Sequence, residues 1–140
     1  MSEEPTLLGR VSARLGEVDY AVDLRAGKHR LVADEPASQG GANAGPGPFS
    51  LLLSGLAACT AITLRMYAQR KGWKLAALDV ETQIFRQGSA SHIDRKISLH
   101  GDLDDAQRSR LLEMSDKTPV TLTLKGGIEI RTTLEQPGVA

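Results

Sequence analysis

The stretch that decides the fold is Phe49–Leu64, FSLLLSGLAACTAITL, sixteen residues without a single charge. Apolar residues occupy every side of this stretch, and the helical pattern continues to about Arg70 or Lys71. A helix that is apolar all round is normally buried in a protein core. The sequence therefore predicts a long buried central helix. One face recurs at steps of four and three, formed by Leu52, Leu56, Cys59, Thr63 and Met66.

The ends of this helix carry ordinary start and stop signals. Pro48 suits the first helical turn, and Gly72 suits the residue after the last one. A membrane-spanning helix needs about 20 apolar residues, and the uncharged run is shorter and interrupted by four Ser or Thr residues. We therefore expect a core helix and no membrane partner.

The segments before the helix alternate between apolar and polar residues. Leu8–Leu15, Asp19–Leu24 and Arg30–Ala33 are separated by turn residues, which predicts a three-stranded antiparallel meander. Pro36–Pro48 is rich in Gly, Ala, Ser and Pro and is expected to be a semi-rigid loop.

The segments after the helix predict a hairpin, a helix and a last strand. Leu75–Arg86 and His92–His100 alternate around a Gln-Gly-Ser turn, and Asp104 begins an amphipathic helix that ends near Asp116. Thr118-Pro119-Val120 opens a short helical or irregular segment, and Gly126–Leu134 is expected to be a strand. The order βββ–α–ββ–α–β separates strands from helices, which is typical of an α+β fold.

Length and charge narrow the classes of function. The 140 residues suit one domain, 1–140, with 41% hydrophobic and 24% charged residues. Seventeen basic and seventeen acidic residues give a net charge of zero, so no nucleic-acid partner is expected. Met1–Pro5 is acidic and polar, whereas a signal peptide begins with basic and then apolar residues. We therefore expect the protein in the cytoplasm.

The central helix needs cover on more than one side. Six strands in a chain of this size cover one side only. A second copy of the chain, placing the same helix against this one with two-fold symmetry, would cover the other. The alternative is that the Asp104–Asp116 helix covers it within the chain. We favour the homodimer.

Metal and cofactor chemistry is not indicated. His92 and His100 lie about 26 Å apart along one strand at about 3.3 Å per residue, and no clustered His or Cys motif occurs. The glycine loop before the central helix lacks the Gly-Lys-Ser/Thr of a phosphate loop, and its prolines remove amide donors. No metal and no cofactor is expected.

Cys59 is the one cysteine of the chain, which excludes an intramolecular disulfide. Free cysteine most often packs as a small apolar residue. A reactive thiolate would need a cation supplied by tertiary contact, because Cys59 lies about three turns into the helix, beyond the reach of the helix dipole. The candidate cations are the arginines of the first meander, Arg10, Arg14, Arg25 and Arg30.

Several stretches together resemble the OsmC/Ohr family of osmotically inducible and organic hydroperoxide resistance proteins. The resemblance runs from about residue 7 to 134 and is most specific around Cys59. It is carried by GKHRLVADEP at 27–36, GG at 40–41, GPGPFSLLL at 45–53, AACTAITLRMYA at 57–68, KGW at 71–73 and KTPV at 117–120.

The resemblance implies an intertwined α+β homodimer and a thiol peroxidase. In the family, the helix cysteine attacks the O–O bond, and a second cysteine resolves the sulfenic acid as a disulfide. An Arg of the meander and a Glu at the start of the helix hold the thiolate. A dithiol donor then reduces the disulfide.

This chain keeps only part of that apparatus. Cys59 matches the attacking cysteine, and Arg25 or Arg30 would match the thiolate-stabilising arginine. The position of the second cysteine holds Thr118, and the carboxylate position falls at Phe49 or Ser50.

Two main hypotheses follow from this pattern, and a redox sensor that uses one exposed thiol is a third. The first is a weak, one-cysteine, cysteine-based reductase of small organic hydroperoxides that depends on an external thiol. The second is a catalytically inactive homodimer that binds a small apolar or thiol-reactive ligand between its subunits. The reactivity of Cys59 distinguishes them.

Overall fold

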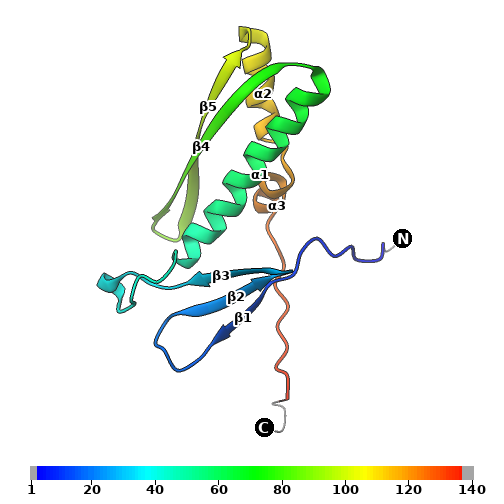
Figure 1. Ribbon diagram of the computed structural model, residues 1–140. Coiled ribbons are helices and arrows are strands. Elements are labelled where there is room, and N and C mark those ends of the chain that lie inside the picture. Colours follow the sequence, from blue (N-terminus) through cyan, green and yellow to red (C-terminus); the bar gives the residue numbers. More distant parts are fainter. Residues whose placement is uncertain (1–2, 137–140) are drawn as a thin grey trace. The chain divides into compact units, whose positions relative to one another are not determined.

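The computed structural model describes residues 3–136 and forms two compact units (Figure 1). The first unit comprises Met1–Ser54 with Arg86–Ser91, and the second comprises Gly55–Phe85 with His92–Ala140. Strands and helices are segregated along the chain, so the predicted α+β class is confirmed.

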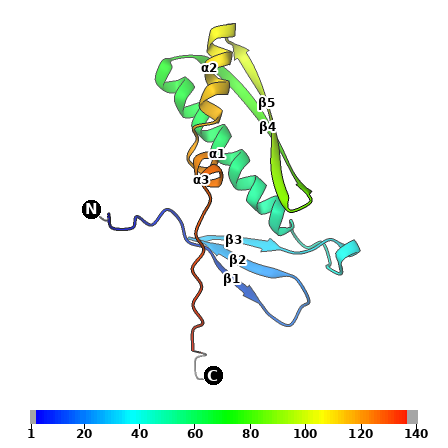
Figure 2. The same ribbon diagram turned by 180° about the vertical axis from the view of Figure 1, so that it is seen from behind.

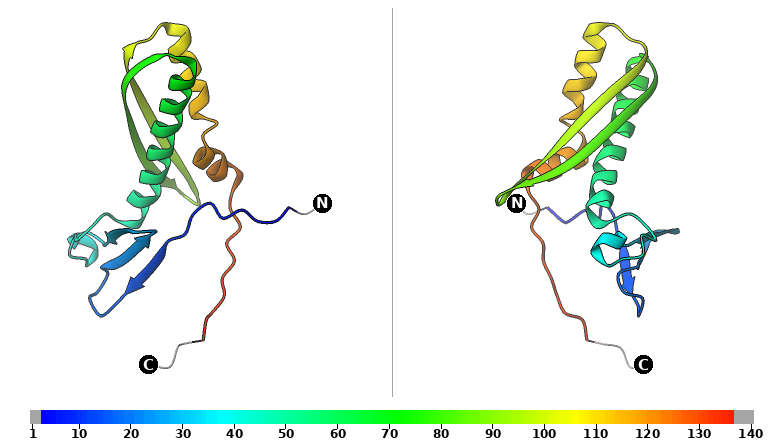
Figure 3. Two further views of the ribbon diagram at one scale, coloured as in Figure 1. Left: turned by 45° about the vertical axis from the view of Figure 1, so that its right-hand side comes forward. Right: turned by 90° about the vertical axis from the view of Figure 1, so that its left-hand side faces the viewer.

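The first unit contains the predicted meander. Strands β1 (Ser12–Leu15), β2 (Val22–Ala26) and β3 (His29–Ala33) pair antiparallel in the order β1-β2-β3, as the left panel of Figure 3 shows in blue. The β2–β3 turn contains Gly27 at φ 61°, a conformation that glycine adopts at little cost. β1 is shorter than predicted, since Leu8 to Val11 form no strand.

A buried carboxylate organises the loop that follows β3. Asp34 is 3% exposed and accepts hydrogen bonds from the amides of Ala44, Glu35 and Ala42 at 3.1, 2.7 and 3.2 Å. The amide of Ala44 is the main cause that lowers the pKa of Asp34; burial opposes it, and the other two amides act with it. The 3-10 turn η1 (Ala37–Gln39) lies within this loop. The glycine segment is thus a tethered connector.

Helix α1 (Pro48–Lys71) begins and ends where the sequence predicts. Pro48 occupies the first helical position, and Gly72 follows the helix at φ 72°. The helix is long and apolar enough to cross a membrane by length and composition alone, with a mean hydropathy of 1.6. Two of its four buried residues, Leu64 and Ala68, pack in the core of the second unit.

The second unit contains the greater part of α1 and of a long hairpin, together with two shorter helices. Strands β4 (Lys74–Gln87) and β5 (Ala90–Asp102) form the hairpin, and α2 (Asp105–Ser115) and α3 (Pro119–Gly126) follow. α1 and α2 lie side by side along the hairpin, as seen from behind in Figure 2 and from the side in Figure 3. Asp104 caps α2 by accepting from the amide of Gln107 at 2.8 Å.

The core of this unit is small and aliphatic. Five buried side chains from α1, β4, α2 and the segment before α2 form it: Leu64, Ala68, Leu75, Leu103 and Leu111. Ile97 and Leu99 of β5 pack against this cluster. Leu111 of α2 and Leu75 of β4 therefore pack on the same buried stripe of α1.

Two predictions about the elements need correction. Residues 127–136 form no strand, although an apolar alternation exists there, because alternation alone does not supply the backbone partners a strand needs. The central helix is also buried along one stripe only, comprising Leu56, Thr60, Leu64 and Ala68. Of the predicted face, only Leu56 is buried. Because the helix is apolar on every side, the spacing of its apolar residues does not indicate which side faces the core. Ile62 and Met66 remain 55% and 57% exposed.

Candidate functional site

Cys59 lies near the middle of α1 and is half-buried. Its Sγ is 3.9 Å from the hydroxyl oxygen of Thr63, one helical turn further on. This is a weak contact in which either atom could donate, because the residues at i and i+4 of a helix share one face. The next residue, Thr60, is fully buried and donates its hydroxyl hydrogen to the carbonyl of Leu56 at 2.7 Å. The sulfur therefore lies at the border between core and surface.

Thr118, at the position that matches the family's second cysteine, is fully buried. It is the N-cap of α3, where its hydroxyl accepts from the amide of Thr121 at 3.4 Å. The two hydroxyl oxygens of Thr118 and Thr121 are 2.6 Å apart. Thr118 thus has a structural task, since it starts the helix that follows it. The predicted short segment after Thr118 is confirmed as a helix.

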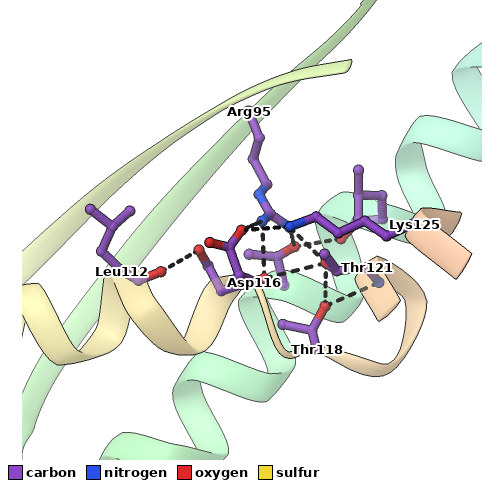
Figure 4. Close-up of polar contacts among 9 residues, drawn as sticks. Arg95, Leu112, Asp116, Thr118, Thr121 and Lys125 are labelled. Carbon is purple, nitrogen blue, oxygen red and sulfur yellow. Dashed lines mark hydrogen bonds and ion pairs between the residues drawn. The ribbon is translucent and has the colours of Figure 1, made fainter. Parts of the chain in front are cut away.

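Arg95 of β5 joins these two regions (Figure 4). Its Nη1 donates to the hydroxyl of Thr60 at 3.0 Å and to the hydroxyl of Thr121 at 2.9 Å. Its Nη2 donates to the carbonyl of Ser115 at 2.9 Å, which is the last residue of α2. One guanidinium therefore contacts α1, the end of α2 and α3. We call Arg95, Thr60, Ser115, Asp116, Thr118 and Thr121 the Arg95 cluster.

The charge of Arg95 has one partial counterion. Asp116 Oδ1 is 3.5 Å from Nη2, and the side chains of Arg95 and Asp116 are 13% and 64% exposed. Asp116 also pairs with Lys125 at 3.4 Å. Much of the compensation for burying this guanidinium comes from the oxygen dipoles of the cluster, including a carbonyl at the C-terminal end of α2.

Sequence reasoning missed Arg95, although a signal was present. On β5, Arg95 shares the inward parity of Ile93, Ile97 and Leu99, and all four are partly buried while the residues between them are exposed. Successive side chains of a strand point to opposite faces. A charged residue at an inward position must find partners or leave its charge unpaired. A charged residue at an inward position of an alternating strand is therefore the signal that could have identified Arg95.

The two predicted arginines lie in the first unit. Arg25 and Arg30 are directly opposite each other on β2 and β3. Arg30 donates to the carboxylate of Asp23 at 3.2 Å, and both side chains are largely exposed. Their role toward Cys59 stays a prediction.

Phe49 and Ser50 also belong to the first unit, in the opening turn of α1. Phe49 is 54% exposed, and the guanidinium carbon of Arg86 lies 6.0 Å from the centre of its ring. The carbonyl of Ser50 accepts from the hydroxyl of Ser54 at 2.7 Å. At the predicted carboxylate position, this chain therefore has an aromatic ring that contacts an arginine by a cation–π interaction.

Metal chemistry finds no support in the described part of the chain. Among residues 3–136, no group of three or more His, Cys, Asp or Glu side chains is arranged to hold an ion. The loop amides of Ala42 and Ala44, which a phosphate would need, already donate to Asp34.

A family model described as OsmC-like protein matches residues 40–133, which include Cys59, Arg95 and Thr118. A comparison with curated protein sequences gives no match.

Solved structures show where this fold occurs. An OsmC-like protein from Mycoplasma pneumoniae is 22% identical with a TM-score of 0.74, and the match covers 90% of each chain. The organic hydroperoxide resistance protein OhrB of Bacillus subtilis is 19% identical with a TM-score of 0.61, covering 86% of this chain and 92% of that one. A putative organic hydroperoxide resistance protein from Vibrio cholerae, with captopril bound in one of the active sites, is 20% identical with a TM-score of 0.63, covering 91% and 92%. At these identities the likeness shows the fold.

Proposed function

This chain belongs to the OsmC-like protein family, and on that basis we propose that Cys59 reduces small organic hydroperoxides with electrons from an external thiol. The observation that carries the proposal is the half-buried Cys59 on α1, within the part of the chain that the family model matches. Two similar structures bear the name organic hydroperoxide resistance protein.

The proposed reaction has two stages. The Cys59 thiolate attacks the terminal oxygen of the hydroperoxide, the O–O bond breaks, and the alkoxide takes up a proton and leaves as the alcohol. Cys59 is then a sulfenic acid. An external thiol attacks this sulfur, water is released, and Cys59 and the external thiol form a mixed disulfide. A second thiol displaces Cys59 as the thiolate, so that two thiols are oxidised to one disulfide.

The chain itself offers no second thiol for resolution, because Cys59 is its one cysteine. Thr118 cannot form a disulfide, so each turnover depends on a collision with a thiol in solution. We therefore expect slow turnover and further oxidation to the sulfinic acid at high peroxide. Arg25 or Arg30 is proposed to stabilise the thiolate.

The proposed assembly is a two-fold homodimer in the cytoplasm, with residues 1–140 acting as one domain. Support comes from α1, where Ile62 and Met66 are more than half exposed in a single chain. Large exposed apolar side chains on one helix are typical of a surface that another chain covers.

Cumene hydroperoxide consumption tests the function. Wild type should consume the peroxide with dithiothreitol or dihydrolipoamide as reductant, whereas Cys59→Ser should not. Ser54→Ala is a matched control on the same helix, because it removes an exposed hydroxyl that bonds the carbonyl of Ser50. Equal rates for wild type and Cys59→Ser would overturn the proposal.

The second candidate is the inactive homodimer that binds a small apolar or thiol-reactive ligand between subunits. The observation that favours it is the chemistry of two matched positions, where Thr118 caps a helix and Phe49 contacts Arg86. A Cys59 thiol that resists iodoacetamide at neutral pH in the folded protein would favour this candidate. Rapid alkylation would favour the reductase.

A further inference from the structure

Arg95 holds together two parts of the site that lie far apart in the sequence. Its Nη1 is shared by Thr60 on α1 and Thr121 on α3, at 3.0 and 2.9 Å. The hydroxyl oxygen of Thr121 is 2.6 Å from that of Thr118. Three consecutive contacts therefore lead from the residue beside Cys59 to position 118. Figure 4 shows the part of this path that runs from Arg95 through Thr121 to Thr118.

We propose that Arg95 is the positioning residue of the Cys59 site, setting how closely position 118 approaches the helical turn of Cys59. The proposal deepens the proposed function, because it concerns the same thiol. Thr60 directly follows Cys59, and neighbouring Cα atoms are about 3.8 Å apart. Neighbouring residues on a helix point in different directions, so Arg95 acts through Thr60 and the backbone of α1.

The task needs an arginine. The guanidinium presents five donors in a rigid planar fork, whereas lysine offers three donors at one point. Four of its contacts are to oxygen atoms of Thr60, Ser115, Asp116 and Thr121, which come from α1, α2, the residue after α2 and α3. A planar fork fixes the mutual orientation of these segments as well as their separation. With 13% of the side chain exposed, water cannot readily replace these contacts.

An engineered thiol pair measures this geometry. Thr118→Cys removes the hydroxyl contact with Thr121 but leaves Arg95 in contact with Ser115, Asp116 and Thr121, on either side of position 118. In this background, the fraction of protein with a disulfide between Cys59 and the introduced cysteine is measured in glutathione buffers. It gives the effective concentration of one thiol toward the other. We expect Arg95→Met to lower this effective concentration at least tenfold, because the turn that carries position 118 loses its link to α1. Arg95→Lys should recover part of the loss.

Arg108→Met is the matched control. Arg108 lies in the same unit and donates to the carbonyls of Leu103, Leu99 and Gly101 at 3.3, 2.8 and 3.3 Å, with no contact to the Arg95 cluster among its hydrogen bonds. It should change the effective concentration less than twofold. An Arg95→Met protein within twofold of its parent would overturn the proposal. A parent that forms no disulfide at any glutathione ratio would overturn it too.

A second pair of variants keeps the test decisive should Arg95→Met fail to fold. Thr60→Val keeps the shape of the side chain and removes the link between Arg95 and α1. It should lower the effective concentration several-fold. Thr123→Val is its control, because Thr123 makes the same type of bond to the carbonyl four residues earlier, at 2.9 Å, without an arginine contact. Equal effects of the two variants would contradict the proposal.

This readout requires no hydroperoxide. A protein that fails to consume peroxide, yet shows the expected dependence on Arg95, would overturn the proposed function and support the positioning role. A protein that consumes peroxide, but whose effective concentration does not change in the Arg95 variants, would support the proposed function and overturn the positioning role.

Discussion

The guanidinium of Arg95 lies 3.0 Å from the hydroxyl oxygen of Thr60, so a cation from β5 contacts the central helix one residue beyond Cys59. Thr60 can accept this hydrogen bond because its own hydrogen is donated to the carbonyl of Leu56. The contact joins residues 35 positions apart and ties the hairpin to α1. Polar and apolar contacts therefore both hold the second unit together.

The stability of this unit should depend on Arg95. Arg95→Met removes four hydrogen bonds from one largely buried side chain, which we expect to lower the free energy of unfolding by about 1–3 kcal/mol. Urea unfolding measures the change. Arg131→Met is the control, because the exposed pair of Arg131 with Glu129 should contribute less than about 0.5 kcal/mol. Equal decreases in the free energy of unfolding for the two variants would mean that burial of the Arg95 cluster does not strengthen its hydrogen bonds.

Acid should weaken the loop around Asp34. The pKa of this carboxyl is lowered in the folded state, chiefly by the amide of Ala44, so its contribution to stability is fully present well above the ordinary value of 3.8. The contribution is lost as the pH falls below that value toward the folded-state pKa. Thermal midpoints measured from about pH 7 to about pH 3 should fall less steeply for Asp34→Asn than for wild type. Asp102→Asn, which removes an exposed carboxylate, should keep the wild-type slope.

Two glycines of the same loop should differ sharply in their tolerance of a methyl group. A Cβ on Gly45 would collide with the backbone oxygen of Val32, whereas a Cβ on Gly47 would lie 3.7 Å from that of Asp34, an ordinary contact. Both residues precede a proline, so the local backbone restriction is matched. Gly45→Ala should lower the free energy of unfolding by about 1–3 kcal/mol and Gly47→Ala by less than about 0.5 kcal/mol. A chemical denaturation series compares them, and similar values would refute the close packing of this loop.

Phe49 and Arg86 should be energetically coupled. A guanidinium 6.0 Å from an exposed ring is expected to contribute about 0.5–1 kcal/mol. A double-mutant cycle with Phe49→Leu and Arg86→Met isolates this coupling in the free energy of unfolding. Additive effects of the two substitutions would show that the contact is not energetically significant in solution.

The exposed apolar side of α1 should mediate self-association. Ile62→Glu places a charge where the proposed partner subunit packs, and burying an unpaired charge is costly. Sedimentation should show a dimer for wild type and a monomer for Ile62→Glu at micromolar concentration. Ser109→Glu adds the same charge at an exposed position of α2, away from this side of α1, and should remain dimeric. A dimeric Ile62→Glu protein would exclude this part of α1 as the interface.

Local patterns predicted the elements of this fold well. Pro48 and Gly72 marked the ends of α1 correctly, because the restricted φ of proline and the left-handed φ of glycine act within a single turn. Asp104 likewise marked the start of α2. The prediction of a strand at Gly126–Leu134 was wrong. A strand needs hydrogen bonds to a neighbouring strand, and the residues of one segment do not show whether such a neighbour exists.

The sequence singled out Cys59 only through the residues around it. Its neighbours on α1 resemble a family, and the family model bears this out over residues 40–133. The spacing of residues did not reveal Arg95, because 35 residues separate it from Thr60 and hydrogen bonding over that distance is decided by packing. The roles of Arg25 and Arg30 stay predictions for the same reason.

The sequence by itself determined where α1 begins and ends, the order of the strands and helices from β1 to α2, and that one thiol is present. Those properties depend on backbone preferences and composition, which act within a few residues. Only the tertiary structure decided which stripe of an apolar helix is buried and which arginine reaches the residue beside Cys59. The physical reason is that a buried charge takes its partners from whichever segments the core brings within hydrogen-bond distance.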